Sequence, residues 1–184
     1  MALVSQSDFE ARLGRSLTAE EASAFTVINA ALQAHVERLI GSSVESVSAT
    51  TRYYDGGVQH LSIDPCTNIT AIDAVDDDQV STYTYDTSDY TAEPINRTLK
   101  NWVRHRSGKL FRGINNIRVT AKFSIYGDEG LRNIVKNAIL EGLSSEIENT
   151  DNVLKESIEG YSVEYATTET KNALSGLKYL FPGV

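Results

Sequence analysis

The spacing of apolar residues changes twice along this chain, and that change most constrains its fold. Apolar residues recur every three or four positions over 18–41, every second position over much of 46–123, and at helical spacing again from Leu131 to Ile147. The first and last patterns predict amphipathic helices, and the middle pattern predicts half-buried strands. The sequence therefore predicts an α+β fold. We expect a helical core of residues 1–45 and 126–184, an antiparallel bundle of the N- and C-terminal helices, with an antiparallel β-rich insertion of residues 46–125.

Local signals place the ends of the N-terminal helices. Ser7 is the expected N-cap of a short helix that stops near Gly14, because a serine hydroxyl can accept a bond from an unpaired backbone amide. Thr18 and Glu21 have the spacing of a capping box. Gly41 follows the last apolar residue and can adopt the left-handed conformation that ends a helix.

The C-terminal third is predicted to be mainly helical. The helix that contains Leu131 and Ile147 is followed by acidic residues, which we interpret as a linker through Asp151. A short extended segment at 161–165 and a final helix over 168–180 are expected after it.

The β-rich region contains several candidate strands, of which the last alternates most clearly. Its odd-numbered positions from Ile117 to Phe123 are apolar and its even-numbered positions are polar, which is typical of an antiparallel strand with one solvated face. Asp76–Asp78 is interpreted as a solvated turn, since Asp is a preferred turn residue. The candidate strands are 47–54, 61–63, 69–75, 80–85, a weaker one around Trp102, and 115–123.

Composition excludes a protein held by an internal disulfide and a protein with a membrane-spanning helix. The chain has 184 residues, of which 41% are apolar, so it can bury one core with an insertion. Its single cysteine, Cys66, cannot form an internal disulfide. The chain has no apolar run of the ~20 residues that a membrane-spanning helix needs. The segment 1–6 lacks the basic and apolar regions of a signal peptide, so we expect the protein to be intracellular when it is made.

The charge is distributed unevenly. The net charge is −8, yet the stretch 97–122 contains eight basic residues and no acidic one. Three interpretations of this stretch are open. It can be a basic face that meets an acidic face on a neighbouring subunit, a solvated face, or a DNA contact in which Trp102 and Phe111 add stacking.

No catalytic or metal-binding motif is present. His35, His60 and His105 have no zinc-type spacing with one another or with Cys66, and we expect them at the surface or at an interface. Asp76–Asp78 lacks the Gly and Glu of a calcium-binding loop. The sequence predicts a protein that is not an enzyme and has no cofactor or metal.

The tyrosines admit two interpretations. Three of the nine tyrosines, Tyr83, Tyr85 and Tyr90, lie on or near one expected hairpin. Tyrosine packs well in strands and also offers contact area with a polar tip at interfaces. Both ordinary strand packing and an interface are therefore open for this hairpin.

A series of ordinary elements resembles a known family. The helix closing at Gly41 is followed by Arg52-Tyr53-Tyr54-Asp55-Gly56, Leu61-Ser62-Ile63-Asp64-Pro65, Ile69-Thr70-Ala71-Ile72, Trp102, Ile117-Arg118-Val119-Thr120, the helix around 134–143 and Leu177-Lys178-Tyr179-Leu180. In order and spacing this series resembles the head–tail adaptor (head-completion or connector) proteins of long-tailed bacteriophages. Most of the chain takes part in the resemblance.

The resemblance implies a structural role in the virion neck. Subunits would form a ring, a dodecamer, beneath the portal, extend the DNA channel, and join the head to a tail-side stopper or tail-completion protein. Double-stranded DNA would pass without specific binding, no membrane would be involved, and assembly would take place in the host cytoplasm. Residues 168–184 would dock on the portal. The residues expected at the portal are Leu174, Leu177, Lys178, Tyr179, Leu180 and Phe181.

The basic stretch provides the expected subunit or tail-side interface of such a ring. A head-to-tail ring needs two different complementary patches, and complementary charge fixes their register. The residues assigned to this interface are Arg104, Arg106, Lys109, Phe111 and Arg112. The alternative function is a nucleic-acid-binding module that uses residues 97–122.

Overall fold

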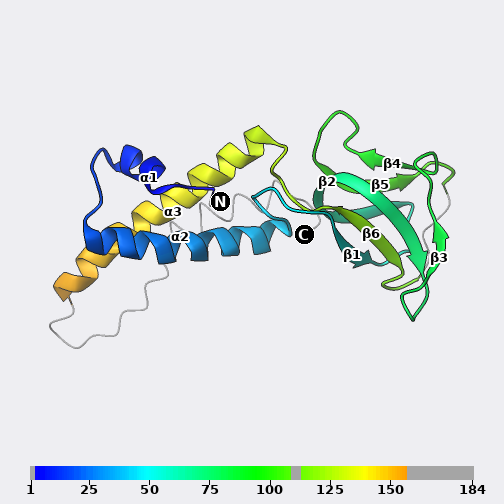
Figure 1. The fold of residues 1–184 in the computed structure, drawn as a ribbon, viewed down its shortest axis with the longest axis horizontal. Coiled ribbons are helices and arrows are strands. Elements are labelled where there is room, and N and C mark those ends of the chain that lie inside the picture. The colour runs from blue at the N-terminus through cyan, green and yellow to red at the C-terminus, as the bar shows by residue number, and fades with distance from the viewer. Residues whose placement is uncertain (1–2, 109–112, 157–184) are drawn as a thin grey trace. The chain divides into compact units, whose positions relative to one another are not determined.

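The structure, a computed structural model, describes residues 3–108 and 113–156. The described residues form three helices and six strands, and every paired strand is antiparallel. This confirms the predicted α+β class with an antiparallel sheet. The chain divides into two compact units, a helical unit of residues 3–39 and 130–156 and a sheet unit of residues 40–129. Figure 1 follows the elements in order by colour.

The helical unit contains α1 (Gln6–Leu13), α2 (Ala19–Ile40) and most of α3 (Glu129–Glu156). The Phe9 ring of α1 stacks on the Phe25 ring of α2 with centroids 5.6 Å apart. Lys136 of α3 forms an ion pair of 2.7 Å with Asp8 of α1. In Figure 1, α2 and α3 run in opposite directions. The buried apolar side chains of the three helices include Phe9, Phe25, Val36, Val135, Ile139, Leu143 and Ile147.

The helix ends agree in part with the prediction. The capping box of α2 is confirmed, because Thr18 Oγ1 accepts from the Glu21 amide and Glu21 accepts from the Thr18 amide. The predicted cap of α1 was wrong. Ser5, not Ser7, is the N-cap, and its hydroxyl accepts from the Asp8 amide while the Asp8 carboxylate accepts from the Ser5 amide. Asp8 supplies the carboxylate of this capping box, whereas Glu10, three residues after Ser7, accepts from Gln6 and from the Leu17 amide instead.

The predicted linker through Asp151 was also wrong, because α3 continues to Glu156. Residues 148–156 contain neither Gly nor Pro. Once a helix is nucleated, each added residue gains one backbone hydrogen bond, so a run of polar residues without a breaker extends it. The extended segment 161–165 and the helix 168–180 lie outside the described residues.

The sheet unit is built around one long central strand. The strand order is β1-β6-β2-β5-β4, and β3 also pairs with β2. In this order, β6 lies between β2 and the outer strand β1, and β5 lies between β2 and the outer strand β4. The strands are β1 (Thr50–Tyr54), β2 (His60–Val75), β3 (Ser81–Thr84), β4 (Tyr90–Glu93), β5 (Lys100–His105) and β6 (Ile117–Lys122).

Three predictions about the strands needed correction. The expected strands 61–63 and 69–75 are one strand, β2, whose register shifts three times, between Ser62 and Cys66 against β5, between Thr67 and Ala71 against β6, and between Ala74 and Val75 against β3. A proline is tolerated where a bulge leaves its missing amide unneeded, so Pro65 does not end the strand. β4 was not predicted, because its four residues have no marked alternation and are held by pairing with β5. β1 begins at Thr50 rather than at 47.

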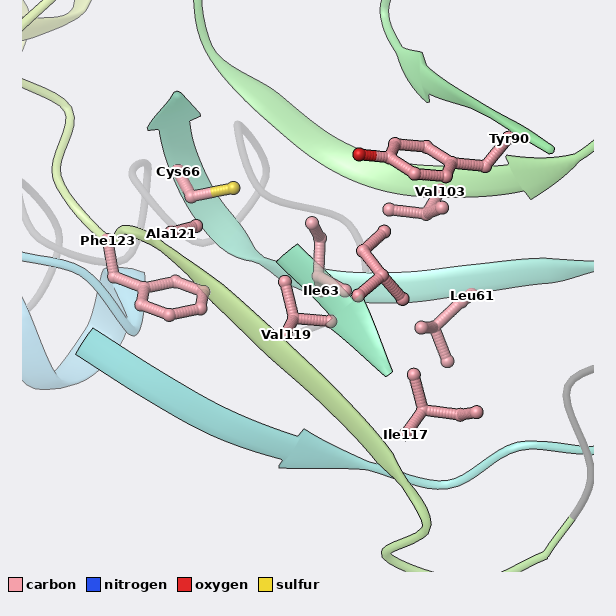
Figure 2. Packing of buried hydrophobic residues seen from close by; sticks show 10 residues of the cluster. Leu61, Ile63, Cys66, Tyr90, Val103, Ile117, Val119, Ala121 and Phe123 are labelled. Atoms are coloured by element: carbon pink, nitrogen blue, oxygen red, sulfur yellow. The ribbon is translucent and has the colours of Figure 1, made fainter. Parts of the chain in front are cut away.

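The core of the sheet unit forms on the face that the sequence predicted for β6. Ile117, Val119, Ala121 and Phe123 are buried, which confirms the alternation. They pack with side chains from β2, β4 and β5, and Figure 2 shows these side chains pointing toward one another between the strands. The other members of the cluster are Leu61, Ile63, Cys66, Ile72, Tyr90 and Val103.

Candidate interaction surfaces

The described basic residues of the stretch 97–122 do not lie on one pair of adjacent strands. Lys100 and Arg104 lie on β5, and Arg118 and Lys122 lie on β6. These two strands are consecutive in the chain, but they pair with β2 and not with each other. The basic residues are therefore divided between two strands with β2 between them.

Most of the described basic side chains of this stretch bind groups of the same subunit. Arg104 Nε lies 2.7 Å from Glu93 of β4, and Arg106 Nε donates to Thr91 Oγ1 at 3.0 Å. Lys100 Nζ donates to two backbone carbonyls, those of residues 94 and 95. Glu93 thus neutralises Arg104, whereas Lys100 and Arg106 keep their positive charge and use donors within the subunit.

Asp73 of β2 joins three strands through its carboxylate. Arg118 of β6 forms an ion pair with it at 3.0 Å, and the hydroxyls of Thr84 and Ser81 of β3 donate to it at 2.6 and 3.3 Å. Burial opposes ionisation, but the hydrogen bonds from Thr84 and Arg118 outweigh it and hold the pKa of Asp73 below its usual value. This cluster holds β6, β2 and β3 together.

A second polar cluster surrounds Asp64 of β2. Arg52 Nη1 lies 2.6 Å from Asp64 Oδ2, and the Tyr54 hydroxyl donates to the same oxygen at 2.8 Å. Arg52 also donates to the Gly41 carbonyl, and its guanidinium lies 4.2 Å from the centroid of the Phe123 ring. Burial, followed by the negative charge of Asp64, raises the pKa of Tyr54. The cluster fixes the backbone at Gly41 to β1 and β2.

No prediction from the sequence brought Arg52, Tyr54 and Asp64 together. A signal was present, because Arg52 and Tyr54 are two residues apart and so share one face of a strand. Their common partner could not be identified, since Asp64 belongs to another strand whose register depends on the bulges of β2.

The structure places Cys66 and the three histidines, which are the candidates for catalysis or metal binding. Cys66 is fully buried, and burial raises the pKa of its thiol to about 12, so it stays protonated at neutral pH. His35 and His60 are exposed as expected. His105 is buried, against expectation, and its Nδ1 lies 2.9 Å from Ser107 Oγ. Among the described residues, no group of His, Cys, Asp and Glu is arranged to hold a metal.

The hairpin of β2 and β3 contains the turn that was predicted at Asp76–Asp78. Asp76 Oδ1 accepts from the amides of Asp78 and Val80 at 3.1 and 2.8 Å, so the carboxylate closes its own turn. The tyrosines of this region differ in burial, and the interface interpretation stays a prediction. Tyr90 is buried in the core, whereas Tyr83 is exposed and its ring contacts Tyr85 edge to face at 4.9 Å.

Several predicted site residues lie outside the described residues. They are Lys109, Phe111 and Arg112 of the basic stretch and all six expected portal-docking residues, Leu174, Leu177, Lys178, Tyr179, Leu180 and Phe181. Of the predicted subunit or tail-side interface, the structure therefore places Arg104 and Arg106, which lie within β5 and directly after it.

No protein-family model matches the chain, and no curated protein matches it. None of the described helices is both long and apolar enough to cross a membrane. Function is therefore inferred from the residues, the order of the elements and the geometry.

Proposed function

We propose that this chain is a structural head–tail adaptor of a tailed bacteriophage. Its copies form a ring, a dodecamer, beneath the portal, and the ring extends the DNA channel and joins the head to a tail-side stopper or tail-completion protein. The observation that carries the proposal is the way the chain is divided. Residues 3–39 and 130–156 belong to one helical unit, and an antiparallel sheet unit is inserted between them. This is the arrangement that the resemblance to head–tail adaptors implies.

The polar clusters of the sheet unit support a structural role. Asp73 and Asp64, which are the centres of the two clusters, bind arginine and hydroxyl groups of neighbouring strands. A catalytic acid or base needs a group held ready for a substrate, and these carboxylates instead tie strands together. A rigid sheet unit suits a protein whose work is to hold neighbours in register.

The charge of the chain suits a channel component. The net charge is −8, and a negative wall repels the phosphates of passing DNA and keeps them from binding. The basic residues that could attract phosphate are partly neutralised within the subunit, as Arg104 is by Glu93 and Arg118 by Asp73. Both features favour DNA that passes without specific binding.

The C-terminal segment 168–184 is assigned to the portal. Its apolar residues Leu174, Leu177, Leu180 and Phe181 would anchor the segment, and Tyr179 and Lys178 would complete the contact. Because a segment that orders on binding loses conformational entropy, portal contact and ring closure would be coupled.

The deciding experiment is to mix the purified protein with its cognate DNA-filled, portal-bearing heads and to image the vertex by electron microscopy. A new ring below the portal is expected. A chain truncated after Leu174 and a Leu177→Asp/Leu180→Asp variant should leave the heads bare while retaining the circular dichroism of the described fold. Ser175→Ala is the matched control and should decorate heads normally.

Bare heads in the presence of folded wild-type protein would overturn the adaptor role. The alternative, a nucleic-acid-binding module, predicts DNA affinity that falls steeply with salt. It would also predict a loss of that affinity when Arg104, Arg106 and Arg112 are replaced by Ala. Normal decoration by the truncated chain would refute only the assignment of the portal-docking segment.

A further inference from the structure

Two open edges of one sheet stand out among the surfaces of the sheet unit. Within the six-stranded sheet, β1, β6, the C-terminal half of β2 and β3 are consecutive neighbours, so β1 and β3 are the two outer strands of this group of four. All four residues of β3 are exposed, and three of the five residues of β1 are exposed. The edge strand β4 is more covered, with Tyr90 buried and its other residues half-buried. β1 and β3 are thus the accessible edges.

Among the described residues, β1 and β3 contain no proline, and their one charged residue is ion-paired within the subunit. Natural edge strands carry charges, prolines or covering segments that prevent such pairing. β3 has the sequence Ser-Thr-Tyr-Thr, without charge or proline, and it is flanked by Val80, which is 60% exposed. β1 has one charged residue, Arg52, whose guanidinium is bound to Asp64. Both edges therefore present uncharged, hydroxyl-rich strands.

The backbone of β3 offers hydrogen-bonding groups on its outer side. The Tyr85 amide donates to the Ile72 carbonyl of β2 at 2.9 Å. In an antiparallel pair, residues with bonds toward the partner alternate with residues whose amide and carbonyl point away. Thr84, which is opposite Asp73, therefore directs its amide and carbonyl to the open edge.

The direction of the strands decides how two copies can meet. β1 is antiparallel to β6, β6 is antiparallel to β2, and β2 is antiparallel to β3. Because the sheet has an even number of alternating strands, β1 and β3 run in opposite directions. Two copies placed side by side in the same orientation would bring β3 of one next to β1 of the other as an antiparallel pair. Neighbours in a ring have this kind of orientation, since rotation about the ring axis relates them.

We propose that copies of this chain associate edge to edge, with β3 of one subunit pairing with β1 of the next. The occupant of each open edge is a second copy, because the same sheet supplies two uncharged edges of similar length and opposite direction. The contact is heterologous, so it can close a ring or extend a filament. The inference rests on the proposed function for the ring itself and adds the subunit contact within it.

Cysteine cross-linking tests this contact directly. Thr82→Cys on β3 is combined with Thr50→Cys or with Thr51→Cys on β1. Since successive side chains of a strand point to opposite faces, one of the two β1 positions shares the face of residue 82. After mild oxidation, one double variant should give a ladder of disulfide-linked oligomers of three or more subunits. Each single variant should stop at dimers. Circular dichroism should match that of the wild type for every variant.

Thr91→Cys on β4, combined with the same β1 cysteine, is the matched control and should give no ladder. Wild-type protein, in which Cys66 is buried, should give no cross-link at all. The measurement is made on the free protein and on head-bound protein, so that a contact that forms only in the assembled ring is also detected.

The outcomes separate this inference from the adaptor role. Rings on heads without a ladder from either double variant would overturn the edge-to-edge contact and leave the adaptor role standing. A ladder from free protein together with bare heads would support the contact and refute the adaptor role. A ladder of equal yield from the Thr91→Cys control would also overturn the assignment of β3, because the cross-linking would then not depend on that edge.

Discussion

Replacement of Gly41 by alanine should destabilise the sheet unit more than the same change at Gly14. Both glycines end a helix in the left-handed region, with φ of 73° at Gly41 and 70° at Gly14. An alanine in this conformation costs ~1–2 kcal/mol at either site. A Cβ atom at Gly14 would meet nothing within 4 Å, whereas a Cβ at Gly41 would lie 2.7 Å from Asp64 Oδ1. The two variants therefore share the backbone cost and differ in the steric one.

The additional cost at Gly41 follows from the contacts of Asp64. To relieve the close approach, the Asp64 carboxylate must turn away, which breaks its bonds to Arg52 and Tyr54. Hydrogen bonds to charged groups contribute ~1.5–3 kcal/mol. Because the Asp64 and Arg52 side chains keep 27% and 35% of their exposure, the lower end applies. The expected loss is ~3 kcal/mol for Gly41→Ala and ~1 kcal/mol for Gly14→Ala.

Urea denaturation measures both losses. Trp102 fluorescence follows the sheet unit, and circular dichroism at 222 nm follows the helices. A double-mutant cycle tests the cause, since Asp64→Ala should cost less free energy of unfolding in the Gly41→Ala background than in the wild type. Equal losses for Gly41→Ala and Gly14→Ala, or an Asp64→Ala cost that does not depend on residue 41, would refute the reasoning.

Three further predictions concern the N-cap of α1, the thiol of Cys66 and the ion pair of Arg118 with Asp73. Ser5→Ala should lower the free energy of unfolding by ~1 kcal/mol, because it removes the cap of α1. Ser7→Ala should change it less in the same urea titration, and the reverse order would restore Ser7 as the cap. The Cys66 thiol should not react with Ellman's reagent at pH 8 until the chain is unfolded, because its pKa is raised to about 12 by burial; rapid reaction of the native protein would contradict that burial. Arg118→Ala should cost about 2 kcal/mol, less than a fully buried ion pair, since it leaves the Asp73 carboxylate without its cation. The folded-state pKa of Asp73 lies below its ordinary 3.8, so this pair stabilises the wild type fully above pH 3.8 and is lost as the pH falls through the lower folded value. In Arg118→Ala the loss should begin at higher pH, and identical acid-denaturation curves would show that the pair contributes nothing.

The helix ends show which structural features a local sequence pattern can predict. The Thr18–Glu21 capping box and the stop at Gly41 were predicted correctly, because each depends on residues within one turn of the helix. The cap of α1 was misplaced by two residues, since two serines compete for one role and only the geometry of the Asp8 carboxylate selects between them. The far end of α3 was missed because polar composition alone does not end a helix.

The basic stretch shows where a one-dimensional pattern fails. Its eight positive charges lie within the stretch 97–122, which has no acidic residue, and this concentration suggested a single surface. Arg118, however, binds Asp73, which is 45 residues away, and Arg104 binds Glu93 of a strand that was not predicted. The net charge of a segment does not reveal the partners that tertiary pairing brings to it.

By itself, the sequence determined the class of the fold, the helical segments over 18–41 and from Leu131 to Ile147, and the buried face of β6. These features depend on periodicity and on hydrogen bonds between near neighbours, and both can be read along the chain. The tertiary structure alone decided that β2 runs unbroken through Pro65, that β4 exists, that Arg52 and Tyr54 meet at Asp64, and that β1 and β3 are left as open edges. Strand pairing joins residues far apart in the sequence, and its register depends on bulges and on the whole core, so no local pattern specifies it.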